Sequence, residues 1–157
     1  MIYEFCAENV TLLEKAMQAG ARRIELCDNL AVGGTTPSYG VTKAAVELAA
    51  DYDTTIMTMI RPRGGDFVYN DLEISIMLED IRLTAQAGSQ GIVFGALTAD
   101  KKLDKANLEK LIDASKGMEV VFHMAFDDLS HEDQLEAIDW LSQAGVTRIL
   151  TRAGVSG

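Results

Sequence analysis

The sequence predicts an α/β fold, a (β/α)8 TIM-type barrel of which the 157 residues supply about six βα units. The first observation is a repeat in which Gln-Ala-Gly ends an amphipathic segment and a short β-rich run follows. The repeat occurs at residues 18–20, 86–88 and 143–145. Each interval holds two units of roughly 30 residues, the size of a βα module. Glycine suits the position after a helix because it adopts the left-handed conformation without a Cβ penalty.

The second observation is strict alternation of strand and helix signals. Strands are expected at residues 2–6, 23–27, 55–61, 91–96, 119–125 and 147–151. Helical stripes occupy residues 10–19, 41–48, 70–86 and the segments after Asp104 and Ser130, with capping boxes expected at Thr11–Glu14, Asn70–Glu73 and Ser130–Asp133. Such alternation gives a parallel sheet with helices outside. The alternative is a doubly wound open sheet, but the first strand–helix turn carries no Gly-rich phosphate fingerprint.

No Gly/Ser/Pro-rich linker divides the chain, so we expect one domain over residues 1–157. A complete barrel needs about 200 residues or more. We therefore expect the C-terminal units to be missing from this chain, which would leave the first and sixth strands as open edges.

Composition narrows the function. The net charge is −10, and an acidic surface repels phosphate backbones and anionic lipid, which disfavours nucleic-acid and membrane partners. The N-terminus lacks a basic stretch followed by an apolar core, so we expect a cytoplasmic protein. Its two cysteines, Cys6 and Cys27, are then expected as thiols.

Side chains that alternate away from the helices are unusually polar. Parallel strands are usually apolar on both faces, yet the inward set comprises Glu4, Cys6, Glu25, Cys27, Met57, Met59, Arg61, His123 and Asp127. Barrel proteins place their chemistry at the C-terminal rim of the strands. We therefore expect Glu25, Arg61, His123 and Asp127 to share one pocket there, or else to form a structural charge network.

The run from Arg61 to Tyr69 follows a strand and precedes a helix. Arg61 and Arg63 could hold an anion, and Gly64 and Gly65 could offer backbone N–H groups to it. Alternatively, Arg61 pairs with a buried acid, Glu4 or Glu25, and the two glycines only form the turn. In that case Arg63, in the loop, is the residue free to reach a ligand or solvent.

Five motifs resemble the CutC copper-homeostasis family in the right order and across nearly the whole chain. They are residues 24–27 (Ile-Glu-Leu-Cys), 33–40 (Gly-Gly-Thr-Thr-Pro-Ser-Tyr-Gly), 61–69 (Arg-Pro-Arg-Gly-Gly-Asp-Phe-Val-Tyr), 94–97 (Phe-Gly-Ala-Leu) and 122–127 (Phe-His-Met-Ala-Phe-Asp). Met124 stands where the family usually has arginine, and we expect it to face the helices. The resemblance implies a cytoplasmic barrel, commonly a homo-oligomer (dimer or tetramer), with a role in copper homeostasis.

Three functions remain open at this point. Cys6 and Cys27, at matching ends of neighbouring strands, could bind Cu(I), for which two thiolates suffice; the alternative is that both are small buried hydrophobic residues. The second function is an enzyme acting on a small anionic substrate, carbohydrate-like or phosphorylated. Arg61 and Arg63 would hold the anion, with His123 as general acid or base, oriented by Asp127 or Glu25. The third is a binding barrel without chemistry.

Overall fold

A computed structural model of the protein describes residues 1–152 and contains a six-stranded parallel sheet in the order β1-β2-β3-β4-β5-β6. Its strands are β1 (Glu4–Glu8), β2 (Arg23–Cys27), β3 (Thr55–Met59), β4 (Gly91–Phe94), β5 (Glu119–Phe122) and β6 (Arg148–Ile149). The helices are α1 (Leu13–Gln18), α2 (Tyr39–Ala50), α3 (Asp71–Ala87), α4 (Lys105–Ala114) and α5 (His131–Ala144), with short 3-10 turns η1 (Leu30–Val32) and η2 (Met124–Asp128). None of these helices is both long enough and apolar enough to cross a lipid bilayer.

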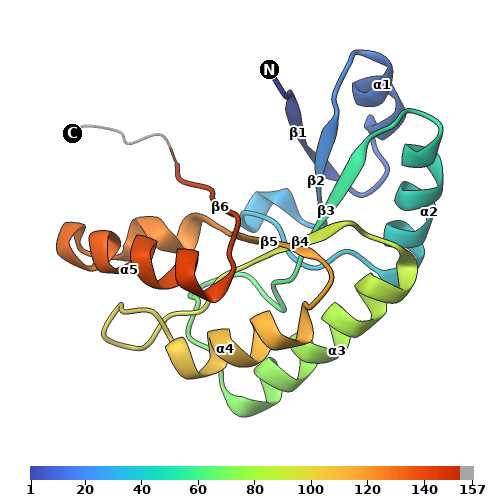
Figure 1. Cartoon of the computed structure of the whole chain (residues 1–157). Helices are drawn as coiled ribbons and strands as arrows, with labels where there is room; N and C mark the ends of the chain where they lie inside the picture. The colour runs from blue at the N-terminus through green and yellow to red at the C-terminus, as the bar shows by residue number, and fades with distance from the viewer. Residues whose placement is uncertain (153–157) are drawn as a thin grey trace.

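The sheet curls into part of a TIM-type barrel, with the helices around its outer side (Figure 1). The strands follow one another in sequence order, whereas a doubly wound sheet reverses its order at a switch point. The doubly wound alternative is therefore wrong. Closure by eight units stays a prediction, because the six described strands leave β1 and β6 at the two ends of the sheet.

The expected strands are all present, but most of their ends differ. β2 has the predicted bounds, and β1 begins and ends two residues later than expected. β3, β4 and β5 begin where predicted and end early. After β5 the backbone N–H of His123 still donates to Phe94, and then the chain turns into η2. This turn ends the strand alternation, which the sequence pattern had continued to residue 125.

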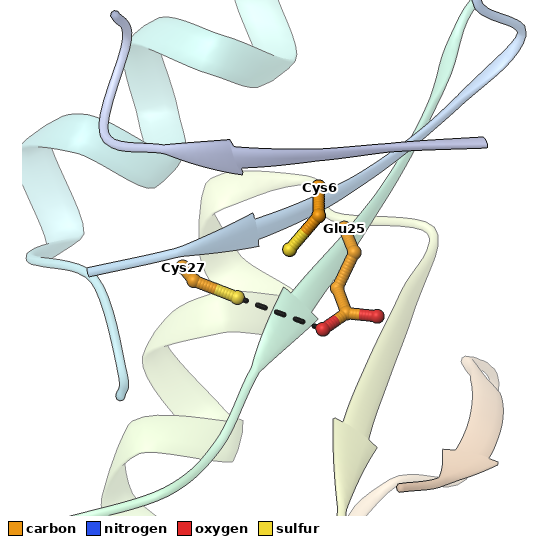
Figure 2. A group of neighbouring side chains, drawn as sticks. All are labelled: Cys6, Glu25 and Cys27. Atoms are coloured by element: carbon orange, nitrogen blue, oxygen red, sulfur yellow. Dashed lines mark hydrogen bonds between the residues drawn. The ribbon is translucent and has the colours of Figure 1, made fainter. Parts of the chain in front are cut away.

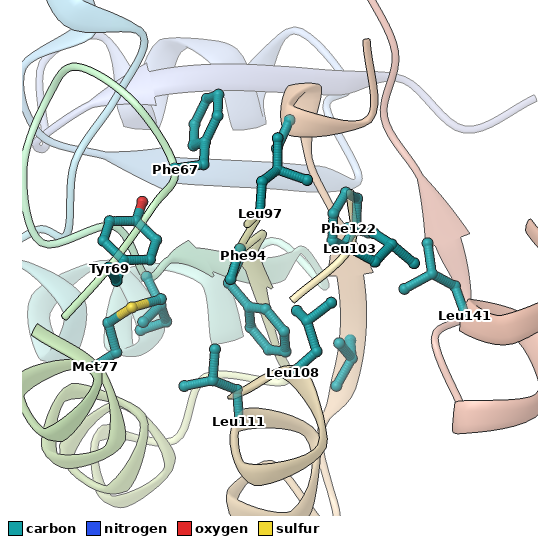
Figure 3. Close-up of a cluster of buried hydrophobic side chains, with 14 of the residues drawn as sticks. Phe67, Tyr69, Met77, Phe94, Leu97, Leu103, Leu108, Leu111, Phe122 and Leu141 are labelled. Atoms are coloured by element: carbon teal, nitrogen blue, oxygen red, sulfur yellow. The ribbon is translucent and has the colours of Figure 1, made fainter. Parts of the chain in front are cut away.

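The outer face of the sheet holds two apolar clusters. One joins β1, β2 and β3 to α1 and α2 through residues such as Ile24, Leu26 and Leu13. The larger one joins β4 and β5 to α3, α4 and α5 around Phe94 and Phe122 (Figure 3). The predicted alternation is confirmed in β2, since Ile24 and Leu26 pack outward and are fully buried.

The inner face holds a separate, sulfur-rich cluster made of Cys27, Met57, Met59, Val93 and Val121. A Cβ added at Gly91 would lie 2.6 Å from the sulfur of Met57 and 2.7 Å from the backbone oxygen of Glu119. The side chain of Met57 therefore fills the space over Gly91.

Charged side chains link the two ends of the curled sheet. Arg148 of β6 lies 3.1 Å from the carboxylate of Glu4 on β1 and 3.4 Å from that of Glu119 on β5. Arg23 of β2 lies 3.7 Å from Glu119. Because β1 and β6 are not hydrogen-bonded neighbours, this contact spans the barrel interior. Glu4 thus meets Arg148, and the pairing of Glu4 with Arg61 is wrong.

The structure agrees with some of the capping boxes expected at the helix starts and not with others. The box at Asn70–Glu73 is confirmed, with both reciprocal bonds present. At Ser130 only the N-cap is confirmed: its hydroxyl accepts the backbone N–H of Asp133 and donates to the Asp133 carboxylate. The box at Thr11–Glu14 is wrong, because α1 begins after Leu12, which is left-handed and makes no side-chain cap.

Candidate metal centre and the barrel mouth

Cys6, Glu25 and Cys27 project from β1 and β2 into the same space inside the curl (Figure 2). One ligand atom from each, two sulfurs and a carboxylate oxygen, lie within 4.8 Å of one another. In the strand register Cys6 pairs with Glu25, and Cys27 pairs with Glu8. The two cysteines therefore sit two residues apart along the strands and not at matching ends, yet their side chains still converge.

The two thiols differ in environment. Cys27 is fully buried, Cys6 is exposed, and the sulfur of Cys27 donates to Glu25 Oε1 at 3.7 Å. The neighbouring Cys27 thiol lowers the pKa of Cys6, while the proximity of Cys6, together with burial, raises the pKa of Cys27. Burial, followed by the nearby charge of Glu4, raises the pKa of Glu25. Cys6 is thus the first thiol to lose its proton, which makes it the more accessible nucleophile and metal ligand.

The loop after β2 lies directly on the Cys27 thiol. Gly34 has a φ of +93°, and a Cβ there would lie 2.9 Å from the Cys27 sulfur and 3.6 Å from the Met59 methyl group. Only glycine allows the backbone this close to the sulfur. The Gly33-Gly34 pair was a signal of such a close approach, although the sequence does not say what is approached.

Arg61 is 3% exposed and occupies the inner rim, but it does not meet a carboxylate. Its guanidinium donates to the backbone oxygens of Val32 (2.6 Å), Gly34 (3.0 Å) and Gly65 (2.9 Å). No acidic oxygen in residues 1–152 lies within salt-bridge distance of it, so the predicted pairing with Glu4 or Glu25 is wrong. Arg61 joins the loops after β2 and β3 and thereby holds Gly34 over Cys27.

Arg63 is also engaged, contrary to the expectation that it is free for a ligand. Its side chain contacts Glu73 at 2.5 Å and Asp66 at 3.1 Å and lies over the ring of Tyr69. Glu73 and Asp66 raise the pKa of Arg63, with Glu73 the larger cause. Arg63 therefore orders its own loop against the start of α3.

The glycines of this loop have structural tasks. Gly65 has a φ of +87°, and its carbonyl accepts from Arg61. A Cβ at Gly64 would lie 3.1 Å from the side chain of Val32. Both glycines let the loop pack closely, which agrees with the turn interpretation of the pair.

His123 lies on the inner side of the rim and is 1% exposed. Its Nδ1 accepts the backbone N–H of Ala125 at 3.1 Å, and its ring lies 4.9 Å from that of Phe67. Burial, assisted by the charge of Arg61, lowers the pKa of His123 to about 3. A Cβ at Gly95 would lie 2.6 Å from the imidazole Cε1. His123 is thus a neutral imidazole whose position depends on Gly95 and Ala125.

A cavity of about 260 Å³ opens beside His123 at the barrel mouth, lined by Glu25, His123, Met124, Leu150, Thr151 and Arg152. Arg61 and Asp127 do not line it, so only two of the four residues predicted to share a pocket do so. Asp127 instead accepts the backbone N–H of Arg152 at 2.7 Å.

Met124 lines this cavity and also packs against the apolar cluster around Phe94 and Phe122, so the expectation that it faces the helices is only partly right. The reason is η2, which begins at Met124 and replaces strand geometry with a 3-10 turn. Leu150, Thr151 and Arg152 were missed altogether. Their position after the sixth strand was the available signal, since barrel sites form at strand ends.

Sequential βα units curled around an inner thiol–carboxylate cluster define a TIM-type barrel protein with a candidate soft-metal site. The profile of the CutC family matches residues 1–156. The chain belongs to the CutC family.

Several known proteins resemble this one. A CutC family protein of Enterococcus faecalis is 55% identical over 157 residues, which cover 100% of this chain and 75% of that protein. A solved CutC structure from Streptococcus agalactiae, named for copper homeostasis, has a TM-score of 0.95 at 48% identity and covers 99% of this chain and 74% of that one. Deoxyribose phosphate aldolase from Aeropyrum pernix has a TM-score of 0.67 at 13% identity, covering 99% of this chain and 63% of that one, which shows a shared fold alone.

Proposed function

We propose that this protein binds Cu(I) through Cys6 and Cys27 and takes part in copper homeostasis. The observation that carries the proposal is the convergence of the two sulfurs with Glu25 inside the barrel. The name of the Streptococcus agalactiae relative supports the copper role. A reducing compartment such as the cytoplasm suits this function, because thiolates bind Cu(I) and a disulfide does not.

The donor set fits Cu(I) with a division of roles. Thiolates are soft ligands, and two of them suffice for Cu(I), whereas the harder carboxylate of Glu25 suits Zn²⁺ or Cu²⁺. Cys27 already donates its proton towards Glu25. Binding of the metal displaces thiol protons, and Glu25 lies where it can accept the proton of Cys27. In this proposal Glu25 accepts the proton of Cys27 and is not a copper ligand.

We also propose that the complete barrel has eight units. The asymmetry of the metal centre supports this, since Cys27 is fully buried while Cys6, on the outermost strand, is exposed. Two further strands beside β1 would cover Cys6 and bury both ligands.

Anaerobic Cu(I) titration against a chromophoric chelator tests the copper proposal. We expect one Cu(I) per chain, and the Cys6→Ser and Cys27→Ser variants each to lose at least about 100-fold in affinity, since one thiolate cannot replace two. Met57→Leu is the matched control, because its thioether is directed to Gly91 and the replacement keeps the volume.

Glu25→Gln separates the two kinds of metal site. A two-thiolate Cu(I) site keeps its affinity within a few-fold in this variant, whereas a three-ligand Zn²⁺ site loses its carboxylate. Unchanged Cu(I) affinity in the variant lacking both cysteines would refute the proposal.

A further inference from the structure

The cavity at the barrel mouth combines polar and apolar walls; it shares Glu25 with the thiol site and is otherwise lined by different residues. Glu25, Thr151 and Arg152 supply polar groups, and Met124 and Leu150 supply apolar surface. At about 30 Å³ for each water in the liquid, its 260 Å³ has room for roughly eight waters, or a metabolite of similar size. Small-molecule sites in proteins have this composition, with a few polar groups that fix the ligand's orientation.

His123 contributes a buried donor with no partner. Because Nδ1 accepts from Ala125, the neutral imidazole carries its proton on Nε2. That Nε2 is buried, and no hydrogen-bond acceptor for it is found in the described part of the chain. Such an unsatisfied donor is costly, so an acceptor from a bound molecule would stabilise it.

The electrostatic surroundings of His123 favour an anion. Burial is the main cause of the low pKa of the ring, Arg61 and Arg152 lower it further, and Arg152 also lines the cavity. Among residues 1–152 the guanidinium of Arg61 donates to three backbone carbonyls and forms no ion pair with an acidic side chain. A ligand oxyanion in the cavity can therefore meet the charge of Arg152 directly, although the chain as a whole carries a charge of −10.

We propose that this cavity binds a small hydroxylated oxyanion, a phosphate monoester or carboxylate. Its oxyanion accepts the Nε2–H of His123 and meets Arg152 at the rim, and its hydroxyl donates to Glu25. Met124 and Leu150 contact the carbon skeleton. Arg61 is a positioning residue for this site, because its guanidinium is already occupied by the rim loops.

Nuclear magnetic resonance of the His123 side-chain nitrogens tests the site. The complete probes are glycerol 3-phosphate and D-glycerate, which carry both an oxyanion and a hydroxyl group. The partial probes are inorganic phosphate, which supplies the oxyanion without the carbon skeleton, and glycerol, which supplies hydroxyl groups alone. We expect at least one of the first two to shift the Nε2 resonance and to bind about tenfold more tightly than either partial probe. No shift with both complete probes at millimolar concentration overturns the proposal.

Arg152→Gln tests the oxyanion contact without touching the core, since Arg152 is exposed. We expect it to weaken binding about tenfold, as loss of a charged hydrogen-bond donor does. Arg22→Gln is the control, because it makes the same charge change at an exposed residue just before β2, at the opposite end of the strands. Equal affinity of wild type and Arg152→Gln overturns the assigned contact.

The ligand site and the copper site can be tested independently of each other. Cys6→Ser is expected to abolish Cu(I) binding and to leave the His123 shift unchanged. A Cys6→Ser protein that no longer binds the probe would contradict a separate ligand site, whatever its affinity for copper.

Discussion

Replacing Arg61 with alanine removes a side chain that joins the loops after β2 and β3. Its guanidinium donates to the carbonyls of Val32, Gly34 and Gly65, and its Cζ lies 5.0 Å from the centre of the Phe67 ring. At 3% exposure the side chain leaves little room for water to replace those bonds. The variant therefore leaves the buried carbonyl of Gly34 without this donor, and it also loses the two part-buried bonds to Val32 and Gly65.

The magnitude follows from the number of bonds lost. A hydrogen bond from a charged donor contributes about 1.5–3 kcal/mol when buried, and the two part-buried bonds contribute less, so we expect a loss of about 3–5 kcal/mol in the free energy of unfolding. For a chain of this size such a loss lowers the melting temperature by roughly 10 °C or more. Arg63→Ala is the comparison. The Arg63 side chain donates to backbone carbonyls, among them that of Val68 at 2.8 Å, and forms ion pairs with Glu73 and Asp66, but it is 38% exposed, so water can replace these contacts and we expect a smaller loss.

Urea unfolding of both variants, followed by circular dichroism, measures the difference. We expect Arg61→Ala to be several-fold more destabilising than Arg63→Ala, and Arg61→Lys to recover little, because an ammonium cannot span three carbonyls in a fork. Equal losses for the two alanine variants, or a loss below about 1 kcal/mol for Arg61→Ala, would refute the role of Arg61 as a clamp.

Three further predictions concern stability. Gly91→Ala should lower the free energy of unfolding by about 1–3 kcal/mol in chemical unfolding, because the new methyl group meets Met57 and the sheet backbone. Gly40→Ala should raise it by about 0.5–1 kcal/mol, because Gly40 lies inside α2 and the nearest atom to an added Cβ is 3.9 Å away. The depressed pKa of His123, about 3, means that the unfolded state binds the proton first as the pH falls below 6.5. Lowering the pH from 7 to 5 should therefore cost wild type about 2 kcal/mol more than His123→Gln, and parallel pH profiles of the two proteins would contradict this. Asn70→Ala should cost about 1 kcal/mol through the lost capping box of α3, with Ser75→Ala, exposed on the same helix, as the control for thermal melts.

The cysteine pair was predictable from the sequence because it depends on local periodicity. Alternation along a strand has a period of two, so Cys6 and Glu25 had to share a face with Cys27 once the strands were identified. The register was not predictable in the same way. It offsets the two cysteines by two residues, and it is set by how β1 and β2 pair and not by either strand alone.

The helix faces show the limit of the same argument. Leu141 of α5 is buried as its stripe predicts, but Leu135 and Ile138 of that stripe are 58% and 45% exposed. Helical periodicity indicates which residues share a face. It does not indicate how far a neighbouring element covers that face, because this depends on tertiary packing.

The sequence by itself determined the order of strands and helices, the inward direction of the two cysteines and two of the helix caps. Only the tertiary structure decided the partners of Arg61 and the position of Met124. Arg61 meets carbonyls 29 and 27 residues away in the chain, on a loop with no periodic pattern. Met124 reaches the cavity because η2 interrupts the strand. Repeating backbone geometry carries information along a strand or helix, whereas contacts between rim loops arise only after the curled sheet has brought its strand ends together.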